Sequence, residues 1–307
     1  MAVTMWFESA QVELVRDTFP EWAAFLFAFL SYLGSVWFVA PAVVLAYWFR
    51  DRNQFASWLG IVIGGYAVML GLKGIFETPR PGVGPAIAPE SLPTVIALLY
   101  APAVEVSSTS FPSGHAVAAT VIWTMFALES DVGTQRQRLF GAATMVALVG
   151  FARVGAGVHF PIDVLVGMVA GVCYLLFVLT VRYRARARHG DHAGASATFT
   201  IAAVLALAAF WTSGRPDTMA LFGGCLGCLL AWQYATPSRE PWPLTLQVGI
   251  RATVGIAALA LLALVLLVVE SLLVWLTVGL GGGLLVVGLP RLASRTAVSR
   301  AQTELVS

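Results

Sequence analysis

The chain has 307 residues, of which 59% are hydrophobic and 11% are charged, with a formal net charge of +2 and a mean hydropathy of +0.83. This apolar share far exceeds that of an ordinary soluble domain, so the composition excludes that class and indicates a membrane protein. The small net charge says little by itself, and we expect no nucleic-acid partner.

The N-terminal segment, residues 5–19, is expected as an interfacial amphipathic helix, with a frayed terminus as the alternative. Its apolar side chains recur at roughly helical spacing among acidic residues. They are Trp6, Phe7, Ala10, Leu14 and Phe19. Charged residues scattered through the same segment interrupt the apolar region that a cleavable signal peptide requires, so we expect none.

Nine apolar runs follow, at or near the length of about 20 residues that a membrane span requires. They are residues 23–49, 55–76, 113–129, 139–156, 161–181, 198–213, 218–235, 247–269 and 272–289. The third and sixth runs are short, so we expect them to be tilted or to extend further. The fold class is therefore all-α, a polytopic bundle of transmembrane helices.

A proline-rich loop, residues 77–112, separates the second and third runs. Its prolines exclude long helices. Its apolar middle, residues 92–103, is expected as a short helix or a re-entrant lid. That segment is either an entry surface for a lipid tail or a packing surface against the bundle.

The distribution of arginine predicts the topology. Arginines gather in the loops after the first, third and fifth runs, and again at the C-terminus. They are Arg50, Arg52, Arg136, Arg138, Arg182, Arg184, Arg186, Arg188, Arg291, Arg295 and Arg300. The positive-inside rule makes these segments cytoplasmic, which requires an odd number of spans. Residues 247–289 must then be two spans joined at positions 270 and 271, for nine crossings in all.

The chain is expected to divide at a basic cytoplasmic loop, residues 186–197. Residues 1–185 carry the interfacial helix and all the polar clusters at membrane depth. Residues 198–307 are expected as accessory transmembrane helices that serve packing or oligomerisation. Cys225 and Cys228 have the spacing of a redox or metal pair, but no second pair accompanies them, so we expect buried thiols.

Scarce polar residues gather in three clusters at the ends of apolar runs, in residues 73–81, 111–115 and 153–163. Charges at membrane depth or its edge mark a functional site by default. Span parity brings all three clusters to one membrane face, which the arginine distribution makes extracytoplasmic. We therefore expect a multi-pass protein of the cell membrane with its active site outside and its C-terminus in the cytoplasm.

The clusters contain the parts of a phosphate-binding site. Lys73, the only lysine, and Arg80 and Arg153 supply cationic donors, of which arginine suits forked contacts with phosphate oxygens. Ser113 is a good helix N-cap, and Gly114 allows close backbone approach. A helix that starts there presents free N–H groups to an anion.

Two histidines supply candidate chemistry. The proline after His159 and Phe160 favours a helix start, which places Asp163 in the first turn, four residues after His159. The carboxylate can accept one imidazole N–H and raise the basicity of the other nitrogen, so His159 is the candidate nucleophile. His115 is the candidate acid for the leaving oxygen. Three cations disfavour a metal, so we expect neither a metal nor another cofactor.

These residues resemble the motifs of the type 2 phosphatidic acid phosphatase superfamily, which also includes vanadium haloperoxidases. The family pattern is Lys-x6-Arg-Pro, Pro-Ser-Gly-His and Ser-Arg-x5-His-x3-Asp. The matching residues are Lys73, Arg80, Pro81, Pro112, Ser113, Gly114, His115, Arg153, His159 and Asp163. The resemblance is strong over residues 55–185. One departure is Ala152, where the pattern has a serine, so one phosphate-facing hydroxyl is expected to be absent.

The resemblance implies a phosphatase-like membrane core in residues 1–185 and a site that needs no metal. It implies that His159 forms a phosphohistidine, that Asp163 orients it, and that His115 transfers the proton. The implied phosphate cradle consists of Lys73, Arg80, Ser113, Gly114 and Arg153.

The expected function is that of an integral-membrane lipid phosphatase that removes a terminal phosphate from a lipid phosphate or a polyprenyl diphosphate. The expected partners are that lipid substrate and the bilayer, and the oligomeric state stays open. One alternative is a phosphotransferase that passes the phosphoryl group to an alcohol. Another is a non-catalytic lipid-phosphate binder, which only Ala152 supports. The haloperoxidase activity is disfavoured because such proteins resemble soluble helical proteins, whereas the composition of this chain indicates a membrane protein.

Overall fold

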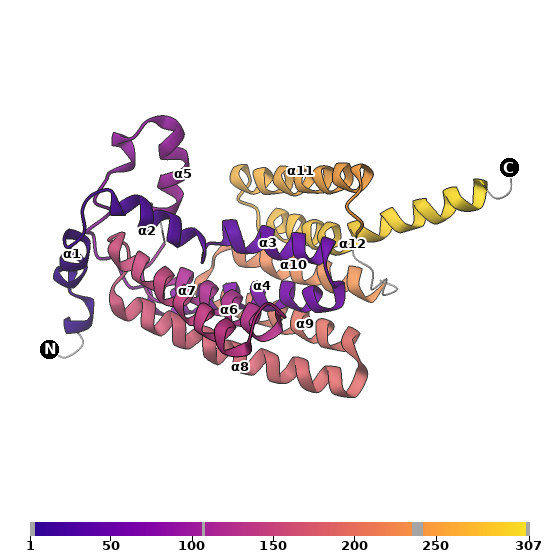
Figure 1. The fold of residues 1–307 in the computed structure, drawn as a ribbon, viewed down its shortest axis with the longest axis horizontal. Coiled ribbons are helices and arrows are strands. Elements are labelled where there is room, and N and C mark those ends of the chain that lie inside the picture. The colour runs from indigo at the N-terminus through magenta and orange to yellow at the C-terminus, as the bar shows by residue number, and fades with distance from the viewer. Residues whose placement is uncertain (1–3, 106–107, 235–241, 305–307) are drawn as a thin grey trace. The chain divides into compact units, whose positions relative to one another are not determined.

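A computed structural model describes residues 4–105, 108–234 and 242–304, and the elements in these ranges are all helices (Figure 1). The expected all-α fold is confirmed. The chain forms two compact units. The first unit consists of Met1–Pro41 and Val68–Phe177, and the second consists of Ala42–Ala67 and Val178–Ser307. The boundaries between these units fall inside helices. They do not test the division that we expected at residues 186–197, which stays a prediction.

The elements up to the middle of the chain are η1 (Thr4–Phe7), α1 (Ser9–Asp17), α2 (Ala23–Tyr32), α3 (Val36–Phe49), α4 (Arg52–Phe76), η2 (Pro89–Ser91), α5 (Thr94–Val104), α6 (Gly114–Glu129), α7 (Gln135–Gly155) and α8 (Pro161–His189). They are followed by α9 (Asp191–Ser213), α10 (Pro216–Gln233), α11 (Leu246–Val268) and α12 (Leu272–Glu304). Each expected apolar run coincides with one of these helices, or with the pair α2 and α3. The short helix expected in the proline-rich loop is α5.

Seven segments among the described residues are long and apolar enough to cross a membrane. They are α4, α7, α8, α9, α11, the joined α2 and α3, and the part of α12 up to Pro290. The 16-residue α6 and the 18-residue α10 are not among them, so nine crossings stay a prediction. The break between α11 and α12, at residues 269–271, includes positions 270 and 271, where the sequence predicted that two spans would be joined.

The first expected span is interrupted between α2 and α3. Gly34 lies in the break, and a Cβ there would stand 2.6 Å from the backbone oxygen of His115, so the two backbones nearly touch. The indole Nε1 of Trp123 donates to the oxygen of Leu33 over 3.1 Å and satisfies a carbonyl that the helix has released. At this break, contacts with α6 therefore take the place of the hydrogen bonds that a continuous helix would make.

The basic segment 186–197, expected as a loop, is instead helical on both sides of Gly190. The nitrogen of Gly190 donates to the oxygen of Arg186 over 2.8 Å, and its φ of 83° lies in the left-handed region that ends helices. Arg186 also pairs with Asp191 at the start of α9. Alternating arginine and alanine are strong helix formers, so α8 continues past the membrane-length run.

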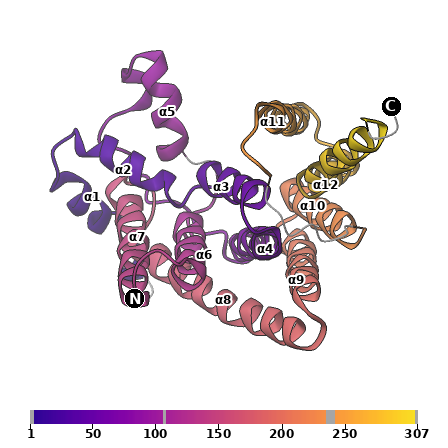
Figure 2. The ribbon, with the colours of Figure 1, turned by 45° about the vertical axis from the view of Figure 1, so that its right-hand side comes forward.

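The first unit brings three helix ends together. Figures 1 and 2 show α6 beside α7, and α2 also packs on α7. The backbone nitrogen of Ser113 donates to the oxygen of Asp163 over 2.9 Å, which joins the start of α6 to the start of α8. The end of α7 at Gly155 precedes α8 by only a short loop. The loops between these helices therefore converge at one end of the unit.

The second unit is built around the crossing of α10 and α12, which lie side by side in Figure 2. A Cβ at Gly227 would stand 2.1 Å from the oxygen of Leu280, and one at Gly283 would stand 2.2 Å from the oxygen of Gly224. Glycines on both helices therefore let the backbones meet directly, as small residues do in membrane helix pairs.

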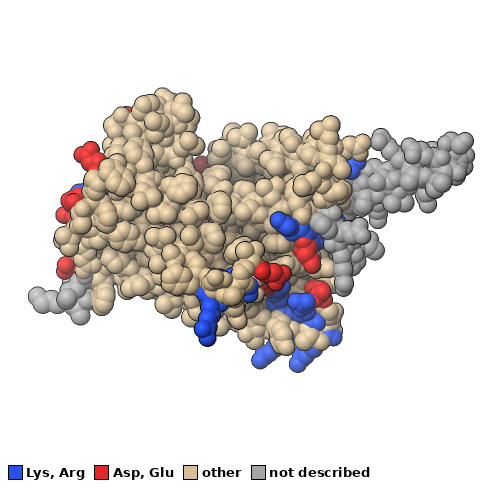
Figure 3. Space-filling model, viewed as in Figure 1, with Lys and Arg blue, Asp and Glu red and all other residues tan. Residues whose placement is uncertain are grey.

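The visible surface in Figure 3 is formed mainly by uncharged residues, with charged side chains confined to a few groups. Large apolar side chains such as Phe29, Leu176 and Leu261 are more than 60% exposed. Such an exterior suits hydrocarbon rather than water, in agreement with a multi-pass membrane protein.

Candidate active site

The loop after α4 and the loop before α8 meet through two glycines. The nitrogen of Gly84 donates to the oxygen of Gly157 over 3.2 Å. Gly157 has a φ of 74°, and a Cβ there would stand only 1.9 Å from the oxygen of Gly84. No side chain fits between these two segments of backbone. The contact brings Arg80 and His159, which are 79 positions apart, to the same place.

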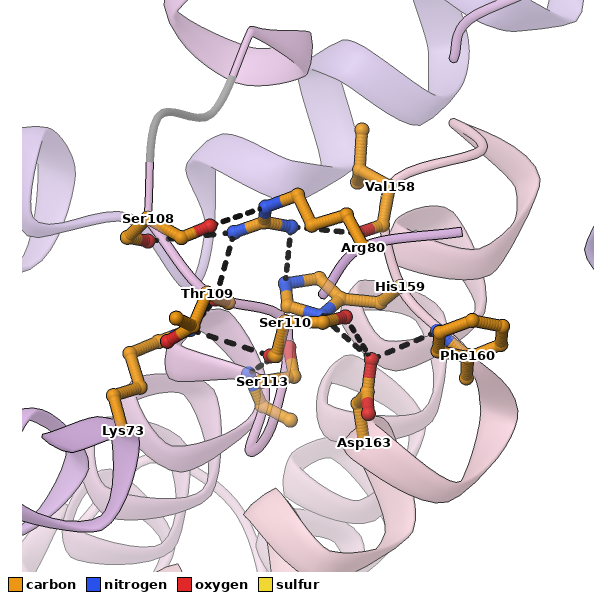
Figure 4. A network of polar contacts seen from close by, with 11 residues as sticks. Lys73, Arg80, Ser108, Thr109, Ser110, Ser113, Val158, His159, Phe160 and Asp163 are labelled. Atoms are coloured by element: carbon orange, nitrogen blue, oxygen red, sulfur yellow. Dashed lines mark hydrogen bonds and ion pairs between the residues drawn. The ribbon is translucent and has the colours of Figure 1, made fainter. Parts of the chain in front are cut away.

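His159 and Asp163 form the predicted pair. The Nδ1 atom of His159 lies 3.1 Å from Oδ2 of Asp163, and both side chains are almost fully buried. The carboxylate also accepts from the backbone nitrogen of Phe160 over 2.9 Å and from the hydroxyl of Ser110. Ser110 Oγ lies 3.4 Å from Nδ1 as well. These contacts hold the ring with Nδ1–H toward the carboxylate and Nε2 free to accept (Figure 4).

Arg80 reaches that second nitrogen. Its Nη1 atom lies 3.3 Å from Nε2 of His159 and donates to the oxygen of Val158 over 2.6 Å. The remaining nitrogens point toward the segment before α6, where Nε donates to the oxygen of Ser108 over 2.7 Å and Nη2 to that of Thr109 over 3.3 Å. The guanidinium is thereby fixed in front of the imidazole (Figure 4).

Lys73 lies in the last turn of α4 and is 7% exposed. Its Nζ donates to the oxygen of Thr109 and, over 3.2 Å, to that of Ser110. Lys73 and Arg80 therefore bond the same short segment, residues 108–110, from two sides (Figure 4). That shared anchorage places two positive charges beside the histidine.

Arg153 is the third cation and is completely buried in the last turn of α7. Its Nη1 donates to the hydroxyl of Ser31 over 2.9 Å and to the oxygen of Ala103 over 2.5 Å. Its Nε and Nη2 are buried and hydrogen-bond to none of the described residues. Two donors on a buried guanidinium therefore remain available for an anion.

The start of α6 has the predicted geometry. Ser113 is the N-cap, and its hydroxyl accepts from the nitrogen of Ala116 over 3.4 Å. Gly114 faces Met69, whose side chain would be 3.2 Å from a Cβ there. His115 follows in the first turn and is close enough to His159 for the two imidazoles to interact electrostatically.

Burial and the surrounding charges set the ionisation of His159 and Arg80. Burial lowers the pKa of His159 well below its usual value, and the positive charges of Arg80, Arg153 and Lys73 lower it further. The imidazole is therefore neutral at pH 7, which is the form in which a histidine can act as a nucleophile. Burial also lowers the pKa of Arg80 to about 10, so that side chain keeps its charge at neutral pH.

The structure thus gathers the predicted residues in the first unit and adds residues that the motif analysis missed. Ser110 contacts both members of the histidine–aspartate pair, and Ser31 contacts Arg153. Ala152 is fully buried in an apolar cluster with Ala28 and Tyr100. Among the described residues, no group of three or more His, Cys, Asp or Glu side chains is arranged to hold a metal.

Comparison with known proteins identifies the family. The PAP2 superfamily profile matches residues 54–187. Phosphatidylglycerophosphatase B of Bacillus subtilis (strain 168) is 31% identical over 160 residues, which span 49% of this chain and 70% of that protein. The crystal structure of Aquifex aeolicus LpxE shares 22% identity, with a TM-score of 0.43 over 56% of this chain and 93% of that chain. The chain belongs to the PAP2 superfamily.

Proposed function

We propose that this protein is an integral-membrane lipid phosphatase that hydrolyses the terminal phosphate of a lipid phosphate through a phosphohistidine. The observation that carries the proposal is the buried imidazole of His159, held at Nδ1 by Asp163 and facing Arg80 at Nε2. Family membership supports the phosphatase class, because the curated relative named above is a phosphatidylglycerophosphatase.

In the first step, Nε2 of His159 attacks phosphorus and the bond to the lipid oxygen breaks. Asp163 accepts the Nδ1 proton in a hydrogen bond and stabilises the positive charge that the ring gains. His115 gives its proton to the leaving oxygen, so that the lipid departs as an alcohol or, from a diphosphate, as a monophosphate.

In the second step, His115 takes a proton from water, and the resulting hydroxide attacks the phosphohistidine. The P–N bond breaks, and inorganic phosphate leaves with His159 restored to its neutral form. Arg153, Arg80 and Lys73 would bind the equatorial phosphoryl oxygens, together with the N–H groups that follow Ser113. The free Nε and Nη2 donors of Arg153 support its part in this cradle.

The substrate class that we propose first is a glycerophospholipid phosphomonoester, and phosphatidylglycerophosphate is the first compound to assay because of the curated relative. Phosphatidate and polyprenyl diphosphates are the competing substrates. We also propose that the site faces outside, where a polyprenyl diphosphate is released after glycan transfer. A comparison of kcat/KM for these three lipids in the same detergent would rank them.

The decisive experiment measures phosphate release by the purified protein, by a His159→Ala variant and by a His189→Ala control outside the site. We expect the control to retain activity and His159→Ala to lose it. A His115→Ala variant should accumulate acid-labile phosphoenzyme with a good leaving group such as p-nitrophenol, because its second step is slow. Equal phosphate release by wild type and His159→Ala would refute the mechanism. Treatment with EDTA should leave the rate unchanged.

A further inference from the structure

The N-terminal segment contacts the three loops that carry the sequence motifs. We call them the Arg80 loop, the Ser113 loop and the His159 loop after one residue in each. The ring of Phe7 meets Phe160 edge-on at a centroid distance of 5.3 Å and Phe111 at 6.1 Å. The hydroxyl of Ser9 donates to the oxygen of Pro81 over 2.7 Å. Phe160 follows His159, Phe111 lies two residues before Ser113, and Pro81 follows Arg80. Each contact therefore falls next to a residue of the phosphate site.

The helix α1 reinforces these contacts from the same side. The Nη1 atom of Arg16 donates to the oxygen of Val83 over 3.1 Å, three residues beyond Arg80. Val12 is completely buried. Val15 packs against an apolar cluster whose members come from the site ends of α6, α7 and α8. They are Ala116, Val154 and Val164. Figure 2 shows α1 close to α7.

These contacts differ from those of a helix that only lies on a membrane. Trp6 is 58% exposed and Leu14 is 71% exposed, so one side of the segment is free to meet lipid. Phe7, Val12 and Val15 are turned toward the protein instead. The expectation of an amphipathic segment thus accounts for its exposed side chains, whereas Phe7, Val12 and Val15 are packed on the protein.

We propose that residues 7–16, which we name the N-terminal clamp, position the phosphate site, with Phe7 as the residue that fixes the His159 loop against the Ser113 loop. The proposal rests on the proposed phosphatase function. Phe7 is a positioning residue that acts through Phe160 and Phe111. Because Ser9 and Arg16 bond the Arg80 loop, one segment holds the nucleophile, the helix N-terminus and a phosphate-binding arginine in register.

The test compares full-length variants in detergent by kcat, by KM, and by inhibition with orthovanadate, which binds as a phosphoryl mimic. Phe7→Ala should lower kcat about 10- to 100-fold, because small misplacements of reacting groups are that costly. It should also weaken orthovanadate inhibition about tenfold. Phe7→Tyr keeps the ring and should restore both values.

The matched control is Phe19→Ala, which removes a ring that contacts Phe27 and Phe151 on α2 and α7. Trp6→Ala tests anchoring to lipid. Both controls should retain kcat and orthovanadate inhibition, even where the midpoint of thermal unfolding falls. Wild-type kcat and inhibition in Phe7→Ala would overturn the proposal. Equal losses in Phe7→Ala and Phe19→Ala would also overturn it, because they would indicate general stability.

Two further arms keep the result interpretable. If Phe7→Ala does not fold, the double variant Ser9→Ala with Arg16→Gln removes the two bonds to the Arg80 loop, together with the exposed ion pair between Arg16 and Asp17. This double variant should still raise the orthovanadate inhibition constant, and an unchanged constant would then refute the clamp. If the wild type releases no phosphate from any lipid, the proposed function fails. Calorimetric binding of orthovanadate to wild type and variants then tests the clamp alone.

Discussion

Ser110 shows how one hydroxyl can organise the buried histidine–aspartate pair of the candidate site. It is completely buried, and its hydroxyl contacts both the imidazole of His159 and the carboxylate of Asp163. Its backbone oxygen also accepts from Lys73, so the same residue joins a cation of the proposed phosphate cradle to the histidine. A buried carboxylate needs each of its donors, because an unpaired charge in an apolar interior is costly.

Ser110→Ala should therefore lower kcat with little change in KM. A hydrogen bond to a charged group contributes about 1.5–3 kcal/mol, which corresponds to roughly a tenfold to hundredfold loss of rate. Ser91→Ala, which removes a hydroxyl bonded to the oxygen of Ala88 on an exposed turn, is the control. Steady-state kinetics of both variants measure the effect. A Ser110→Ala enzyme with the kcat of the control would contradict this role.

The pH dependence of the rate should report the ionisation of His159. Protonation removes the nucleophile, so kcat/KM should fall as the pH drops below the depressed pKa of this histidine. The charge of Arg80 is one cause of that depression. Arg80→Gln should therefore raise the pKa of His159 and move the acid limb to higher pH. Because the titration of the substrate is common to both enzymes, the shift between their profiles isolates the histidine.

A suitable control for that shift is Arg136→Gln, which removes an exposed arginine at the start of α7. Its acid limb should coincide with that of the wild type. An acid limb that stays in place in Arg80→Gln, or that moves to lower pH, would show that another group controls the rate.

At the residue scale, motif spacing predicted the His159–Asp163 contact that the structure contains, because such residue types are rare in an apolar chain. The roles of the cations and the histidines stay predictions. Ser110 carried no such signal, since serine is common and its role depends on a loop conformation. Gly84 and Gly157 were missed for the same reason. Their importance follows from a backbone contact between distant loops, which spacing does not encode.

Among the elements, the crossing of α10 and α12 depends on glycine at the contact. Gly283→Ala would place a methyl group 2.2 Å from the oxygen of Gly224, so we expect a loss of about 1–3 kcal/mol in the free energy of unfolding. Gly281→Ala, in the same helix with no atom within 4 Å, is the matched control. It should be neutral, or stabilising by up to about 1 kcal/mol through helix propensity.

Unfolding in a detergent titration would compare these two alanine variants. A Gly283→Ala protein as stable as Gly281→Ala would show that α10 and α12 separate without cost. Residues 198–307 have no assigned chemistry, so this test examines packing, which is the role expected for them.

Helix positions followed from apolar runs, but helix ends did not. The break at Gly34 arises from contact with α6, and no proline or charge marks it. The continuation of α8 to His189 was missed because arginine was interpreted as a loop signal, although its helix propensity is high. The contacts of Phe7 and Phe19 were missed because an amphipathic pattern does not distinguish lipid from a protein partner.

For the whole molecule, the proposed orientation predicts which residues a membrane-impermeant thiol reagent reaches. Glu77→Cys and Glu105→Cys lie on exposed positions of the loop between α4 and α6 and should react from outside intact cells. Arg188→Cys, at the end of α8, should react only after permeabilisation. The unaltered chain, with Cys173 exposed, provides the background signal. Reaction of Arg188→Cys in intact cells would reverse the topology.

The charge of the candidate site has a consequence for an enzyme that works within a bilayer. Lys73, Arg80 and Arg153 carry three positive charges and Asp163 one negative charge, which leaves +2 in a largely buried place. A phosphomonoester carries about −1.5 to −2 near neutral pH, so it nearly balances that charge. The phospholipids that make up most membranes are diesters whose phosphate group carries a single negative charge, and each would leave a buried cation uncompensated. The site is therefore expected to ignore the lipid that surrounds it and to admit the rare lipid that ends in a free phosphate.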